Sequence, residues 1–136
     1  MHRVLLLYNA TLQNYRLPVF EYFTKQYYKD GIQFIIVCKG IADNQLASKN
    51  IINLKDMNFC SCWKTIQYYQ PDIVILFTGI NNFFIFPFIF LLKLIHIKVI
   101  YWGHGINLQK KQSWRFVYSF LHHCCHTIIL YADHLK

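Results

Sequence analysis

The stretch Gln70–Phe77, QPDIVILF, joins a helix-ending Pro71-Asp72 pair to a continuous apolar run. Such a run, without polar alternation, is typical of a parallel strand that helices cover on both faces. Comparable apolar runs occur elsewhere along the chain, at Val4–Tyr8, Gln33–Val37, Ile51–Leu54, Lys98–Trp102 and Thr127–Tyr131. We therefore predict a parallel sheet of about five to six strands.

Helical periodicity fills the segments between these runs. The first segment opens at Pro18 and stops before Gly31, and the second carries Phe59, Trp63 and Ile66. The two remaining segments cover Phe83–Ile95 and Ser113–Cys124. Alternating strands and helices predict one α/β domain over residues 1–136, a Rossmann-like parallel sheet with helices on both faces.

Composition excludes a disordered chain and favours anionic partners. The 136 residues are 55% hydrophobic and carry a formal net charge of +8. This charge suits a membrane leaflet, a nucleic acid or a phosphate-bearing substrate, and it does not choose among them. The chain has five cysteines, an odd number, and we expect no signal peptide because Met1-His2-Arg3 runs directly into a strand-like apolar run. We therefore expect reduced thiols in a cytoplasmic protein.

A membrane span is the main alternative for Ile73–Leu92, which has no charged residue. Its interior contains the polar turn Thr78–Asn82, and Pro87 interrupts the remaining apolar part, which Lys93 closes. A buried strand followed by a very apolar helix fits this pattern better than a spanning helix does. An integral membrane protein would require detergent for its extraction.

Ligands of parallel α/β sheets gather at the carboxyl ends of the strands. That rule selects Asn9–Arg16, Thr78-Gly79 and Gly103-His104-Gly105. Flanking glycines leave the backbone beside His104 open to a ligand, so its imidazole could act as a general base or bind a substrate hydroxyl. The competing interpretation is a turn that needs two glycines and tolerates an exposed histidine.

The sequence resembles the amino-terminal domain of the retaining GT-B glycosyltransferases of family 4. Four segments carry the resemblance, in the family's order and across nearly the whole chain: Tyr15–Phe20, Gln70–Ile75, Tyr101–Gly105 and Thr127–Asp133. The tryptophan-glycine-histidine-glycine turn is the most specific of them. The first loop departs from the pattern, because it lacks the paired glycines common in the family.

This resemblance implies two Rossmann-like domains that face a cleft, with the acceptor bound by the first. It implies transfer with retained anomeric configuration, without a cofactor or a catalytic metal. His104 would be the catalytic residue. Arg16 matches a basic position of the family's first loop, and together with the strand-end rule this predicts the substrate-binding positions Asn14, Arg16, Thr78, Gly79, Gly103 and Gly105. The donor-binding Glu-x7-Glu region has no counterpart here, so we expect the second domain to be absent and the isolated chain to be inactive.

The implied partners are a nucleotide-sugar donor, held by the second domain, and a glycan or lipid-linked acceptor. An anionic membrane surface on the cytoplasmic side is a further partner that the charge allows. No nucleic acid is expected, because Lys110-Lys111 and Trp114-Arg115 are better explained as a solvated helix entry or a lipid contact. The alternative is a non-catalytic α/β module that is either peripheral to a membrane or binds a protein partner.

Two other motifs carry less weight. The cluster His122–His126 offers zinc ligands, but no cysteine pair with metal-site spacing accompanies it, so histidines at a helix carboxyl end explain it better. The glycines at 103 and 105 begin a dinucleotide-binding fingerprint, which fails at Leu108 where its third glycine should stand.

Overall fold

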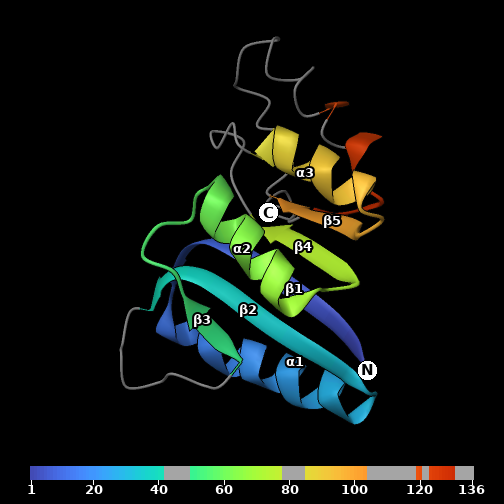
Figure 1. Ribbon diagram of the computed structural model, residues 1–136. Helices are drawn as coiled ribbons and strands as arrows, with labels where there is room; N and C mark the ends of the chain where they lie inside the picture. Colours follow the sequence, from blue (N-terminus) through green and yellow to red (C-terminus); the bar gives the residue numbers. More distant parts are fainter. Residues whose placement is uncertain (42–49, 78–84, 104–118, 121–122, 131–136) are drawn as a thin grey trace, which may run out of the picture.

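The computed structural model describes residues 1–41, 50–77, 85–103, 119–120 and 123–130. Its strands form one six-stranded sheet in the order β3-β2-β1-β4-β5-β6, and every neighbouring pair is parallel (Figure 1). The strands are β1 (His2–Leu12), β2 (Ile32–Ile41), β3 (Ile51–Asn53), β4 (Ile73–Phe77), β5 (Lys98–Gly103) and β6 (Thr127–Leu130). The predicted Rossmann-like α/β sheet is confirmed.

The helical segments between the strands include the 3-10 turn η1 (Asn14–Arg16), α1 (Leu17–Lys29), α2 (Phe59–Tyr69) and α3 (Ile85–Leu94). Pro18 stands in the first turn of α1, where its missing N–H costs nothing. Gly31 follows α1 with a φ of 74°, a conformation that favours glycine. Asn58 and Ser61 form a reciprocal capping box at the start of α2.

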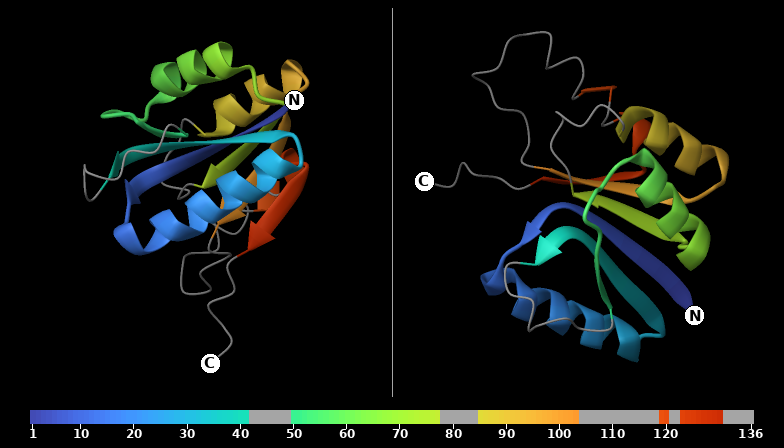
Figure 2. Two further views of the ribbon diagram at one scale, coloured as in Figure 1. Left: turned by 90° about the horizontal axis from the view of Figure 1, so that it is seen from below. Right: turned by 60° about the vertical axis from the view of Figure 1, so that its left-hand side comes forward.

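Helices lie on both faces of the sheet, with α2 and α3 on one side and α1 on the other (Figure 2). The face under α2 and α3 holds the larger core cluster, which includes Leu5, Val74 and Phe88. The α1 face holds a smaller cluster around Leu6 and Phe20. Burial on both faces explains why the strands are apolar without alternation.

The α1 face is covered unevenly. Helix α1 packs on β2, and the residues of β4 and β5 that point to the same face are only half-buried. Ile75 and Ile100 are examples, whereas Val74 and Val99 on the opposite face are fully buried. On the edge strand β6, Ile129 remains 42% exposed. The sheet therefore presents a partly uncovered apolar surface beyond α1.

Two strands extend beyond their predicted ends. β1 continues through the polar stretch after Tyr8, because a register shift lets Thr11 and Leu12 pair with Gly40 and Ile41. β2 likewise reaches Ile41, beyond the predicted apolar run that ends at Val37. Pairing between the two strands overrides the polar sequence there. In the predicted fourth helix, residues 113–118 and 121–122 lie outside the described residues, and residues 119–120 and 123–124 are helical.

The apolar stretch at 73–92 forms strand β4 and helix α3, as expected. Helix α3 has ten residues, about 15 Å at the usual rise per residue. In the part of the chain that the structure describes, no helix is long and apolar enough to cross a bilayer.

Candidate functional site

Strands β1, β4 and β5 are neighbours in the sheet, and Tyr8 of β1 is level with Phe77 and Trp102 at the carboxyl ends of β4 and β5, while β1 itself continues to Leu12. Chain progression reverses between β1 and β4, since β2 and β3 extend the sheet one way and β5 and β6 the other. Rossmann-like proteins bind ligands outside the strand ends at such a reversal. The candidate site therefore lies where β4 and β5 end, beside Tyr8 of β1.

Three aromatic side chains form a row across the strand ends, and we call Tyr8, Phe77 and Trp102 the aromatic row. Tyr8 and Phe77 stack with ring centroids 4.6 Å apart and ring planes 9° from parallel. Phe77 and Trp102 meet edge to face at 5.1 Å. Both are favourable aromatic geometries, so the row is a stiff surface across three strands.

Arg16 lies over this row, at the end of η1. Its Nη1 donates a 2.6 Å hydrogen bond to the Tyr8 hydroxyl, and its Nε donates a 3.2 Å bond to the Tyr15 hydroxyl. The guanidinium carbon lies 5.6 Å from the ring centroids of both Tyr8 and Phe77. Cation–π attraction and hydrogen bonds thus fix a permanent positive charge at the strand ends, which suits a phosphate or carboxylate ligand.

Burial raises the pKa of the Tyr8 phenol, and the neighbouring Arg16 guanidinium opposes that rise. Tyr8 is only 3% exposed and stays a neutral hydroxyl at physiological pH. It can therefore accept the hydrogen bond from Arg16 without cancelling the positive charge.

The indole N–H of Trp102 is a buried hydrogen-bond donor within the aromatic row. Its indole Nε1 has no hydrogen-bond partner in the described structure, although the atom is inaccessible to solvent. An unpaired buried donor typically costs about 1–3 kcal/mol. Unsatisfied groups of this kind are uncommon, and this one belongs to the ring that meets Phe77 in the aromatic row.

The structure places three of the predicted binding residues near these strand ends, namely Asn14, Arg16 and Gly103. Asn14 and Arg16 both lie in η1, Asn14 exposed and Arg16 partly buried. Gly103 is the last residue of β5 and pairs with Leu130. Of the other predicted residues, His104, Thr78, Gly79 and Gly105 lie outside the described residues.

Gly103 has a packing role in addition to the predicted ligand role. A Cβ at this position would lie 2.5 Å from Cε1 and 2.8 Å from the hydroxyl of Tyr101. Tyr101 is only 2% exposed, so its ring has little room to move away. The glycine therefore lets the buried ring of Tyr101 lie across the end of β5.

Sequence reasoning missed the aromatic row as part of the site. Tyr8 and Phe77 ended predicted strands, and Trp102 stood inside the most informative motif, so each was visible alone. Their common signal is an aromatic residue at the last position of an apolar run. Recognising them as a group requires the order of the strands, which the sequence does not state.

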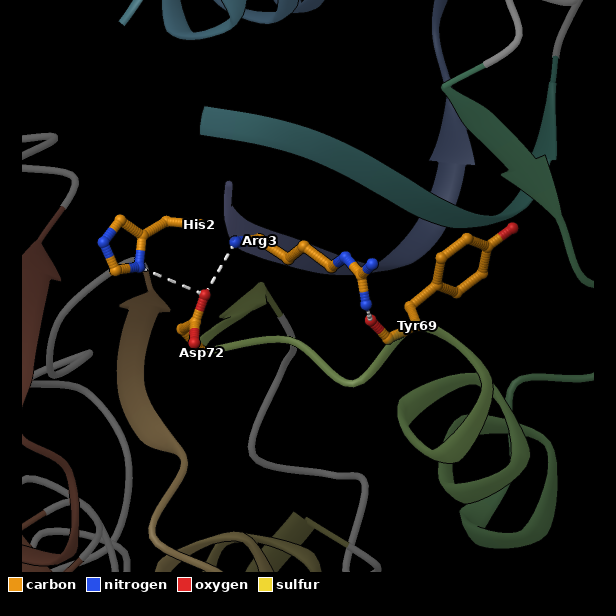
Figure 3. A network of polar contacts seen from close by, with 4 residues as sticks. All are labelled: His2, Arg3, Tyr69 and Asp72. Atoms are coloured by element: carbon orange, nitrogen blue, oxygen red, sulfur yellow. Dashed lines mark hydrogen bonds and ion pairs between the residues drawn. The ribbon is translucent and has the colours of Figure 1, made fainter. Parts of the chain in front are cut away.

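The Pro71-Asp72 motif lies directly before β4, at the amino ends of the strands. Figure 3 shows the contacts of Asp72 there. The Asp72 carboxylate accepts a 2.8 Å hydrogen bond from the backbone N–H of Arg3 and lies 3.4 Å from Nδ1 of His2. Arg3 also donates through Nη1 to the carbonyl of Tyr69, at 2.9 Å. This network ties the end of α2 to the start of β1, so the motif's role in the structure is to join these elements.

The cysteines and histidines near the end of the chain also have structural partners. His126 Nδ1 accepts a 3.1 Å hydrogen bond from the backbone N–H of Val99, and His123 Nδ1 lies 2.7 Å from the carbonyl of Ser119. Burial raises the pKa of the Cys125 thiol to about 12. No three metal-ligating side chains converge among the described residues.

Comparison with solved structures finds proteins of similar fold at low sequence identity. MurG of Acinetobacter baumannii matches with a TM-score of 0.58 at 14% identity, over 100% of this chain and 43% of its own. An alpha-glucosyltransferase in complex with UDP and a mismatched DNA matches at 0.54 and 14% identity, over 98% of this chain and 38% of its own.

A third structure belongs to a different enzyme class. The dTDP-glucose 4,6-dehydratase of Bacillus anthracis str. Ames, in complex with NAD, matches with a TM-score of 0.52 at 15% identity. The match covers 75% of this chain and 37% of the dehydratase. This chain thus spans less than half the length of each of the three proteins.

No family model and no curated protein matches the sequence. At these identities the structural matches show the fold alone. The chain is a Rossmann-like α/β domain with a fold that glycosyltransferase structures share.

Proposed function

We propose that this chain is the acceptor-side domain of a GT-B glycosyltransferase resembling family 4. In this proposal it takes part in moving a sugar from a nucleotide-sugar donor to a glycan or lipid-linked acceptor. Support comes from the two glycosyltransferase structures, which match nearly the whole chain, whereas the dehydratase match covers three quarters of it.

The observation that carries the proposal is the positive charge held over the aromatic row. Arg16 is fixed by Tyr8 and lies over the rings of Tyr8 and Phe77, at the carboxyl edge of the sheet. A phosphate or carboxylate on the acceptor would bind this guanidinium through charge-assisted hydrogen bonds. The exposed amide of Asn14, in the same turn, would bind acceptor hydroxyls.

His104 follows Gly103 by one peptide bond, so we assign it the catalytic position at the end of β5. In this role its imidazole would hold or accept the proton of an acceptor hydroxyl. A sugar hydroxyl could also provide the acceptor that the indole N–H of Trp102 lacks among the described residues. Thr78, Gly79 and Gly105 remain proposed contacts at the same strand ends.

The donor side would belong to a second Rossmann-like domain, since this chain spans less than half of each matched glycosyltransferase. We place the reaction in the cytoplasm, with a lipid-linked acceptor met at the inner face of the membrane. A non-catalytic module that binds a partner at the same edge is the alternative.

Binding to the 136-residue chain tests the proposal. The probes are a short-chain isoprenyl phosphate, neutral oligosaccharides, UDP and NAD, followed by indole fluorescence and saturation-transfer NMR. We expect binding of one acceptor class, with Arg16→Gln weakening a phosphate-bearing acceptor by about tenfold or more. Lys25→Gln, on the exposed side of α1, is the matched control.

The results separate acceptor binding from the alternatives. His104→Ala should leave the far-UV circular dichroism unchanged and weaken acceptor binding. Arg16-dependent binding of UDP or NAD, without acceptor binding, would make the edge a nucleotide site and overturn the proposal. Absence of binding by every probe would also count against it and favour a partner-binding module.

A further inference from the structure

An apolar groove lies on the outer side of α3. Its volume is about 380 Å³, and its lining is formed by Phe86, Ile89, Phe90, Lys93, Leu94, Phe120 and Cys124. Phe86 and Phe120 meet with ring centroids 6.4 Å apart, which joins α3 to the segment near residue 120. Lys93 is the sole charged residue among these lining residues.

The composition of α3 explains why this groove is exposed. The helix reads IFPFIFLLKL, with apolar residues on every side. Ile85, Phe88 and Leu92 fill the face against the sheet. The outer face therefore has to be apolar as well, and Phe90 and Leu94 remain 65% and 63% exposed.

Phe120 adds a third large apolar side chain to the same surface, with 53% of its area exposed. Apolar side chains scattered singly over a surface are ordinary, but neighbouring ones around a groove mark an interaction site. The groove offers few polar groups that could orient a hydrogen-bonded ligand. It therefore suits an occupant that needs apolar contact alone.

The charge distribution indicates what that occupant is. Residues 73–132 contain no Asp or Glu, although the chain has six. The same stretch carries five Lys or Arg residues and five His residues. Lys93 lies in the groove, and His96 and Lys98 follow α3 with exposed side chains. An apolar groove whose lining includes a lysine and no acid, on a stretch of sequence without Asp or Glu, complements an anionic surface.

We propose that this groove docks the chain on an anionic lipid bilayer. Phe90, Leu94 and Phe120 enter the outer acyl region, while Lys93 extends its ammonium to the headgroup phosphates. Helix α3 is about half as long as a hydrocarbon core is thick, so it lies in the interface. A second copy is a poorer occupant, because two such surfaces would bring like charges together.

The proposal depends on the groove and the charge, and it holds whether or not the chain takes part in sugar transfer. Vesicle flotation tests it with two compositions, phosphatidylcholine alone and phosphatidylcholine mixed with phosphatidylglycerol. We expect the full chain to float with the anionic vesicles and to stay below with the neutral ones. High salt should weaken this binding, since it screens exposed charges.

Two variants separate apolar insertion from charge. Phe90→Ser combined with Leu94→Ser should weaken anionic-vesicle binding by about tenfold or more. Lys93→Gln should weaken it by about fivefold. The matched controls change exposed residues of α1: Tyr22→Ser with Tyr28→Ser for the apolar pair, and Lys25→Gln for the charge. Both controls should bind as the unchanged chain does.

A direct readout of insertion uses Phe90→Trp. The fluorescence of the new tryptophan is obtained by subtracting the emission of the parent chain from that of the variant. This difference should shift to shorter wavelength on anionic vesicles, and lipids brominated in the acyl chain should quench it. Binding that survives the Phe90 and Leu94 substitutions would overturn the proposal, as would equal binding to both vesicle types. A dimer in sedimentation that these substitutions dissociate would assign the groove to a second copy instead.

Discussion

The guanidinium of Arg16 donates a 2.6 Å hydrogen bond to the hydroxyl of Tyr8, across the start of the connection between β1 and α1. Tyr8 ends the apolar part of the central strand, and Arg16 immediately precedes α1. The bond therefore couples the shape of the first connection to the middle of the sheet. It also determines where the positive charge of the candidate site stands.

A double-mutant cycle should measure this coupling. Hydrogen bonds to charged groups contribute about 1.5–3 kcal/mol. We expect Arg16→Gln and Tyr8→Phe to interact by about 1.5 kcal/mol in urea unfolding, because either change alone removes the same bond. Effects that add to within about 0.5 kcal/mol would show that the two side chains act independently.

The thiol of Cys62 predicts an alkaline loss of stability. Burial raises the pKa of this thiol from 9.0 to about 11 in the folded chain. Between these values the unfolded chain gives up its proton and the folded chain keeps it, so stability falls as pH rises from 9 to 11. The loss should reach about 2 kcal/mol.

Urea midpoints measured from pH 7 to pH 11 check this prediction. Cys62→Ala should cost about 1 kcal/mol at pH 7 by leaving a small cavity, and it should flatten the alkaline decline. Part of the decline should persist, because burial also raises the pKa of Cys125, to about 12. Cys60→Ala, an exposed thiol of the same helix, should change neither quantity.

The lowered pKa of Asp72 should make the stability of the fold decrease at acid pH. The backbone hydrogen bond from Arg3 lowers the pKa of this carboxyl, and His2 contributes in the same direction. The stabilisation is therefore present above the carboxyl's ordinary pKa, near 3.9, and is lost as pH falls through the lowered value.

Asp72→Asn should destabilise the chain by about 0.5 kcal/mol at neutral pH. The effect is small because the carboxylate is largely exposed and solvent screens its partners. Parent and variant should converge in urea unfolding once the pH falls below the lowered pKa of this carboxyl. A difference that stays constant below that pKa would assign the effect to the shape of the side chain and not to its charge.

Gly103→Ala tests the packing at the end of β5. The added methyl would meet the buried ring of Tyr101, and overpacking of this kind costs about 1–3 kcal/mol. Gly40→Ala is the matched control, since its methyl would make an ordinary 3.6 Å contact with Thr11. Thermal unfolding of both variants gives the comparison, and equal losses would contradict the steric explanation.

The strands and helices were largely predictable, because continuous apolar runs and helix-ending residues are local signals. β4 began and ended where its apolar run does, and Gly31 terminates α1 as its position indicated. The extension of β1 to Leu12 was not predictable, since polar residues were drawn into the sheet by their pairing with β2. Local preference yields to tertiary pairing at such positions.

The candidate site was predictable only in part. Arg16 and Gly103 follow from the rule that ligands gather at strand ends. The aromatic row does not follow, because Tyr8, Phe77 and Trp102 are distant in sequence and meet only through the order β1-β4-β5. The exposed side of α3 was equally hidden, since an all-apolar helix does not indicate which residues it buries.

The central position of β1 has a consequence for biosynthesis. This strand is the first of the sheet to be translated, yet one of its two neighbours, β4, begins only at Ile73. A ribosome adding roughly 5–20 residues per second leaves the β4-facing edge of β1 unpaired for roughly 3–12 seconds. During that interval the nascent chain exposes an apolar strand edge, which makes it a natural client for chaperones that bind at the ribosome exit.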